Sequence, residues 1–232
     1  MHFAPRAARV LALAALPLAL TACGSSGSAG HASSGSSSDP NAGLLTGTQL
    51  KKALAPASFF ASGFAVDPSG ARDSGGTYTP PSSAPAAKPD CGKLGGTAWI
   101  DITGISGVSF AQNDYVDKNT SEDIGQEIDA YRGTTAASVL KSVEKAATAC
   151  TDFTDSQTRT KVRVTGRSTP GLGDGAYTLT LTDPSWDNGS TLVAARVGTN
   201  VVSVMSTDGH DNGAATAKKL TLRIVDALRK ES

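Results

Sequence analysis

Residues 192–205 read LVAARVGTNVVSVM, two apolar segments on either side of Gly198-Thr199-Asn200. A short turn that contains glycine between two such segments is typical of a β-hairpin. The second segment, 201–205, has apolar side chains at both alternating sets of positions, which favours a central place in a sheet. We therefore expect this hairpin to belong to an antiparallel sheet, with its second strand near the centre.

Other segments show the two-residue period of strands. Val162 and Val164 alternate with polar neighbours, as do residues 177–181, 98–103 and 108–110. A less regular strand is expected at 62–67. In residues 124–131, Ile124, Ile128 and Ala130 alternate with polar residues, which predicts one buried face and one solvated face. The patterns together indicate about six to seven strands.

Two longer segments have helical spacing instead. Residues 135–150 and 214–229 each place apolar residues on one stripe with Lys, Arg and Glu outside it. A shorter helix is expected at 46–54, with Thr46 or Thr48 as the N-cap and Pro56 as the stop. Hairpins with one long helix inserted and another at the end indicate an α+β fold.

The N-terminus has the pattern of an export signal. Residues 1–22 carry Arg6 and Arg9, then an apolar run of about 11 residues, which is shorter than the ~20 residues of a membrane-spanning helix. Leu20-Thr21-Ala22-Cys23 resembles the bacterial lipobox, which implies that Cys23 is the lipidated (palmitate-type) N-terminus of a cell-membrane lipoprotein. A plain secreted protein is the alternative.

The remaining chain divides into a tether and a domain. Residues 23–42 are rich in Ser and Gly, and we expect a flexible tether. Residues 43–232 are expected to form one extracytoplasmic domain, with a Pro-rich exposed loop at 68–90. Lys plus Arg and Asp plus Glu are 21 each, so no net positive charge draws in nucleic acid.

Two cysteines remain once Cys23 is assigned to lipid. Cys91 and Cys150 form an even pair in an exported chain, which predicts a disulfide that closes a loop of about 60 residues. The alternative is two free, buried thiols. Cys150 lies on the apolar stripe of its helix, so it is expected to face inward.

No catalytic set stands out in the sequence. His210 is the one histidine beyond the signal and tether, and it lies in a turn-like segment, so a Ser-His-Asp or zinc site is not expected. We expect no metal or other cofactor. Glu127 and Asp129 share a strand face about 7 Å apart. A solvated face is the first interpretation, with contact to a cation or basic partner and cell-wall hydrolysis as alternatives.

Trp99 and Trp186 are the two tryptophans and candidate binding residues. Trp99 would either pack beneath a helix or the Pro-rich loop, or line a cleft. Trp186 lies in a predicted hairpin tip, where aromatic residues often make contacts with ligands. Its indole would otherwise cover an edge of the domain.

The order of motifs resembles a known family. The motifs are LTGTQLKKALAP (45–56), PDCGKL (89–94), AWIDI (98–102), IDAYRG (128–133), AATAC (146–150), GLGDGAY (171–177) and ARVGTNVVSV (195–204). They are similar to those of actinobacterial envelope lipoproteins and PknH-like extracellular sensor domains. The resemblance implies an α+β domain with a surface cleft, and it supports the pairing of Cys91 with Cys150.

The function expected from these observations is non-catalytic. We expect a membrane-anchored domain that binds an unidentified ligand or envelope protein. A cell-wall hydrolase that uses Glu127 and Asp129 is one alternative, and a structural accessory of an envelope complex is another.

Overall fold

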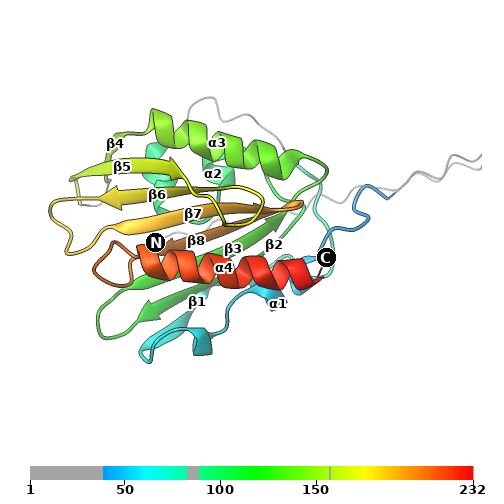
Figure 1. The fold of residues 1–232 in the computed structure, drawn as a ribbon, viewed down its shortest axis with the longest axis horizontal. Coiled ribbons are helices and arrows are strands. Elements are labelled where there is room, and N and C mark those ends of the chain that lie inside the picture. Colours follow the sequence, from blue (N-terminus) through cyan, green and yellow to red (C-terminus); the bar gives the residue numbers. More distant parts are fainter. Residues whose placement is uncertain (1–38, 83–88, 157, 232) are drawn as a thin grey trace, which may run out of the picture. The chain divides into compact units, whose positions relative to one another are not determined.

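The computed structural model describes residues 39–82, 89–156 and 158–231. The signal, Cys23 and most of the tether lie outside these residues, as does part of the Pro-rich loop. Within them, eight strands form one antiparallel sheet in the order β1-β2-β3-β8-β7-β6-β5-β4 (Figure 1). The strands are β1 Phe64–Asp73, β2 Ser109–Asp117, β3 Asp123–Ala130, β4 Asp152–Thr154, β5 Lys161–Ser168, β6 Ala176–Thr182, β7 Ser190–Val197 and β8 Asn200–Ser206.

The hairpin predicted at 192–205 is confirmed as β7 and β8. Val197 pairs with Asn200, and Gly198 takes the left-handed conformation, with φ of 58°, that the tight turn requires. β8 lies between β7 and β3 near the middle of the sheet. Its central place explains why its apolar residues occur on both faces.

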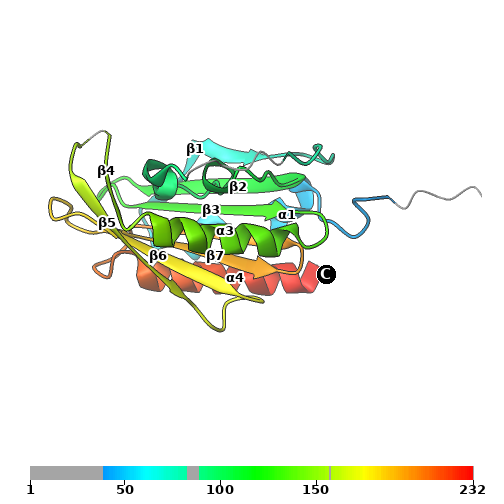
Figure 2. The same ribbon diagram turned by 90° about the horizontal axis from the view of Figure 1, so that it is seen from above.

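Helices cover the two faces of the sheet from opposite sides (Figure 2). The helices are α1 Gly47–Ala53, α2 Ile100–Thr103, α3 Thr135–Ala149 and α4 Ala214–Glu231, with short 3-10 turns η1 Ala57–Phe59 and η2 Cys91–Gly95. α1 and α4 pack on one face, where α4 lies chiefly over β7 and β8. α3, with α2 and η2 beside it, packs on the other face and contacts β5 to β8.

The predicted helices are confirmed with their stops and caps. Thr46 and Gln49 form a reciprocal capping box at the start of α1. α3 ends at Cys150, whose sulfur is buried and bonded to Cys91, with 5.6 Å between the two Cα atoms. The disulfide fixes η2 to the end of α3. No helix in the described part of the chain is long and apolar enough to cross a membrane.

Three sequence predictions about strands were wrong. Residues 98–103 contain helix α2 rather than a strand, because Trp99 and Ile102, three residues apart, both point inward while Ile100 is 44% exposed. The strand expected at 62–67 is present as β1, but it extends through Pro68 to Asp73, so the loop expected at 68–90 begins later; an edge strand tolerates the proline. The count is eight rather than six to seven, since the three-residue β4 has no detectable alternation.

The expected solvated face of β3 was also wrong. All of β3 after Asp123 is buried on both sides. One face packs on α1 and α4 through Ile124 and Ile128. The other lies beneath the chain around Thr97 and Gly107, which contact Glu127 and Asp129. The alternation in sequence marked the two faces correctly, but the covering segment comes from a distant part of the chain.

Candidate functional site

Four carboxylates point to the same side of the sheet, the side that carries α3. Asp123, Glu127 and Asp129 alternate along β3, and Asp114 of β2 pairs with Gly125 between them. We call these four residues the acidic face. α3 does not cover this part of the sheet, because its contacts are with β5 to β8.

Glu127 is held beneath the segment that follows η2. Its side chain is 5% exposed, and its Oε2 accepts a 2.8 Å hydrogen bond from Thr97 Oγ1. Gly125 makes this approach possible, since a Cβ there would come within 3.2 Å of Thr97 Cγ2. Burial raises the pKa of Glu127, and the hydrogen bond from Thr97 only partly offsets it.

The buried charge of Asp129 is stabilised by fewer contacts than that of Glu127. It is 9% exposed, and its Oδ1 lies 3.1 Å from the position that a Cβ on Gly107 would take. Burial, and then the charge of Glu127, raise the pKa of Asp129 well above its ordinary value. Within the described residues, no hydrogen bond to its carboxylate lowers that pKa. The two acids therefore form a buried like-charge pair.

Arg72 is the cation whose charge reaches both acids, and it lowers the pKa of each without overcoming burial. Its Nε donates to Gln112 Oε1 at 2.8 Å, and the Gln112 amide donates to Asp114. Arg72, Gln112 and Glu127 lie in one register row across β1, β2 and β3. None of the ion pairs found among the described residues includes an acid of the acidic face.

A buried hydroxyl continues this row. Ser203 of β8 pairs directly with Glu127, so the two side chains are neighbours on one face. Ser203 is fully buried, and its Oγ has no hydrogen-bond partner in the described part of the chain. Such a group is usually satisfied by water or by a ligand. Ser203 therefore extends the polar row of Arg72, Gln112 and Glu127 to β8.

A hollow of about 250 Å³ lies at the η2 end of the acidic face. Asp123 forms part of its wall, and Phe153 and the half-buried Trp186 supply aromatic surface. Burial raises the pKa of Asp123, and the charges of Asp114 and Asp67 add to the effect. An aromatic ring beside an uncompensated carboxylate suits a cation or a ligand rich in hydroxyl groups.

The sequence-predicted binding residues separate into two groups. Glu127 and Asp129 lie together on the acidic face, and Trp186 lines the adjoining hollow. Trp99 is 1% exposed in the core beneath α3, so it packs under a helix and does not line the hollow. Sequence reasoning missed Thr97 and Ser203, whose roles depend on contacts between segments far apart in the chain.

The arrangement and the pKa shifts of these side chains limit the kind of ligand that the acidic face can bind. No group of three or more His, Cys, Asp or Glu side chains in the described residues is arranged to bind a metal ion. Carboxylates with raised pKa accept hydrogen bonds when ionised and donate when protonated. The acidic face therefore suits an organic ligand with positive charge or many hydrogen-bond donors.

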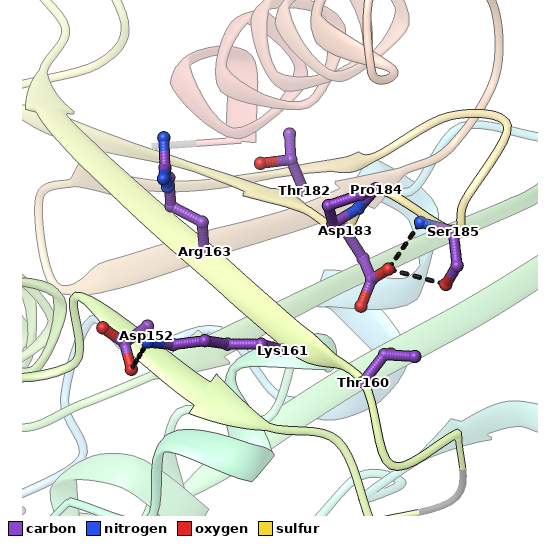
Figure 3. A pocket seen from close by; sticks show the side chains of 8 residues that line it. All are labelled: Asp152, Thr160, Lys161, Arg163, Thr182, Asp183, Pro184 and Ser185. Carbon is purple, nitrogen blue, oxygen red and sulfur yellow. Dashed lines mark hydrogen bonds and ion pairs between the residues drawn. The ribbon is translucent and has the colours of Figure 1, made fainter.

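A larger hollow, of about 700 Å³, lies elsewhere, on the opposite side of the sheet (Figure 3). Lys161 and Arg163 of β5 line it, across from Asp183. Lys161 is paired with Asp152 at 3.2 Å, and the Asp183 carboxylate accepts hydrogen bonds from the Ser185 amide and hydroxyl. The positive and negative charges of the residues that line this hollow balance, and none of the predicted binding residues is among them.

Comparison with known proteins gives a fold but no family. No family model matches the chain, and no curated protein matches it. Among solved structures, the extracellular domain of PknH from Mycobacterium tuberculosis is similar, with a TM-score of 0.55 and 13% identity. The match covers 80% of this chain and 97% of that domain. At this identity the likeness shows that the two share a fold, which agrees with the resemblance drawn from the motifs.

Proposed function

We propose that this protein is a membrane-anchored, extracytoplasmic domain that binds a ligand without catalysis, in the manner of a sensor. The observation that carries the proposal is the buried pair Glu127 and Asp129, which has no cation bound to it in the described residues. A buried carboxylate that lacks an ion-pair partner lowers stability, so its presence favours a role in binding. The shared fold with an extracellular domain supports the proposed location.

The ligand that fits is polar and donor-rich. A positively charged group near Glu127 and Asp129 would offset their mutual repulsion, as Arg72 now does in part. The ring of Trp186 would cover an adjoining apolar or hydroxyl-bearing surface. An amine or an amino sugar combines both features.

Hydrolysis is the weaker candidate for the same residues. A glycosidase needs its two carboxylates at a surface that the substrate can reach. Here Glu127 and Asp129 are only 5% and 9% exposed. Turnover of cell-wall fragments that is lost in Glu127→Gln would nevertheless establish the hydrolase.

Native mass spectrometry of the full-length protein, purified from membranes, tests the proposal. We expect a retained or added small molecule that is lost when Glu127→Gln and Asp129→Asn are combined. Asp226→Asn, on the exposed side of α4, is the matched control and should keep the ligand. A protein that is always empty and shows no saturable binding to envelope extracts would refute ligand binding. One dominant protein crosslink in cells would then favour a structural accessory.

A further inference from the structure

A second exposed surface lies on the opposite side of the sheet from the acidic face. α4 lies over β7 and β8, so it leaves the outer side of β5 and β6 without a helix. Val162 and Val164 point into the α3 core, and the residues that alternate with them therefore point outward on the α4 side. Arg163 and Arg167 are two of these, and both are exposed.

A hollow of about 210 Å³ lies where β5 and β6 meet the start of α4. Arg167 and Lys218 line it, and neither has an ion-pair partner among residues 39–82, 89–156 and 158–231. No acidic residue forms part of its wall. The hollow therefore has an uncompensated positive charge, in contrast to the larger one beside Arg163.

Thr191, whose buried hydroxyl has no partner in the described residues, also lines this hollow. The residue is 1% exposed. Thr191 precedes Val193, which lies two residues further on the same face and packs against α4, so its side chain points to the α4 side. Nearby, Thr178 and Thr169 share a 2.6 Å hydrogen bond between their hydroxyl groups.

The N-terminal end of α4 contributes little to phosphate binding by itself. The Asp211 carboxylate already accepts a 2.8 Å hydrogen bond from the Ala215 amide, so this helix end is capped. The positive charge comes instead from Arg167 and Lys218. Two cations and a hydroxyl donor around a small hollow match the tetrahedral oxygens of a phosphate group.

We propose that the hollow formed by Arg167, Thr191 and Lys218 binds a phosphate group of a phosphorylated ligand. The guanidinium and the ammonium neutralise the charge, and Thr191 Oγ1, which is covered in the ligand-free protein, donates to one phosphate oxygen when a small shift of its surroundings exposes it. The hollow is smaller than a typical drug-sized site, which favours a single headgroup. The site lies apart from the acidic face, and it does not depend on the function proposed there.

Titration of the full-length protein at constant ionic strength tests the site. The probes are inorganic phosphate, glycerol 3-phosphate, and vesicles of phosphatidylglycerol or phosphatidylcholine. The vesicle arms use the Cys23→Ala protein, because the proposed lipid anchor would itself insert into a bilayer. We expect saturable binding of a phosphate-bearing probe, weakened about tenfold or more by Arg167→Ala and by Lys218→Ala. Arg163→Ala, on the same strand and face, is the matched control and should leave the affinity unchanged. Binding of phosphatidylglycerol vesicles alone would identify a lipid headgroup, and binding of the soluble probes would identify a free phosphate compound.

Thr191→Val separates binding from folding. Valine has nearly the same shape and removes an unsatisfied hydroxyl, so the melting temperature of the phosphate-free protein should stay the same or rise. The increase in melting temperature caused by phosphate should shrink in this variant. Absence of saturable binding of every phosphate probe would overturn the proposal, and so would an unchanged phosphate affinity in Thr191→Val. An equal loss of affinity in Arg163→Ala and Arg167→Ala would also overturn it, because it would indicate diffuse charge attraction rather than a site.

Discussion

Thr97 and Glu127 connect two layers of this fold through one buried hydrogen bond, 2.8 Å from Thr97 Oγ1 to Glu127 Oε2. Thr97 follows η2, which the Cys91–Cys150 disulfide fixes to α3. Glu127 belongs to β3 in the sheet. The contact therefore links the disulfide-bonded cover to the acidic face.

Thr97→Val keeps the side-chain shape and removes the donor. We expect the free energy of unfolding to fall by about 1–3 kcal/mol at neutral pH, because Glu127 stays buried without its hydrogen bond. Urea denaturation of both single variants and of the Thr97→Val, Glu127→Gln double variant measures the coupling. Strictly additive effects would show that the hydrogen bond contributes nothing to stability.

Asp129 should make stability depend on pH. Its pKa is higher in the folded protein than in the unfolded chain, so the folded state binds more protons between these two values. The free energy of unfolding therefore falls as pH rises from about 4 through the folded pKa. Asp129→Asn should raise stability at neutral pH and lose this advantage near pH 4. An advantage of equal size at both pH values, measured beside the Asp226→Asn control, would contradict the assignment.

The two tryptophans should differ in fluorescence. Trp99 is 1% exposed, whereas Trp186 is half-buried at the 250 Å³ hollow. Acrylamide should quench Trp99→Phe, which retains Trp186, more strongly than Trp186→Phe. A ligand of the acidic face should change the emission of Trp99→Phe only. Equal quenching of the two variants would show that Trp186 is not accessible.

The disulfide should contribute strongly to stability. Cys91 and Cys150 are 59 residues apart, and closing a loop of that length stabilises by about 4 kcal/mol in the chain-entropy model. The Cys91→Ser, Cys150→Ser double variant should melt at a lower temperature and lose the sensitivity to reductant that the native protein shows. Two reactive thiols in the unfolded, unreduced protein would rule the bond out.

Cys23 is predicted to carry the lipid anchor. Labelled fatty acid should enter the native protein in cells and should be absent from Cys23→Ala, because the thiol is the acceptor. Cys91→Ser is the control for loss of a different cysteine. A native protein that never incorporates the label would refute the anchor and leave the plain secreted alternative.

Strong local patterns were enough to predict much of the fold. The hairpin of β7 and β8 and the helices α3 and α4 each follow from one period sustained over many residues. The prediction of a strand at residues 98–103 was wrong because a short stretch with Trp99, Ile100 and Ile102 fits both a strand and a helical turn. The three residues of β4 are too few to show any period.

The sequence by itself determined the α+β class, the central hairpin and the pair of cysteines available for a bond, since these depend on local periodicity and composition. Only the tertiary structure decided that Glu127 and Asp129 are buried rather than solvated. The segment that contains Thr97 and Gly107 covers them, and no local signal in β3 records a cover that comes from another part of the chain. The same holds for Thr191, whose unpartnered hydroxyl becomes evident only where β6, β7 and α4 meet.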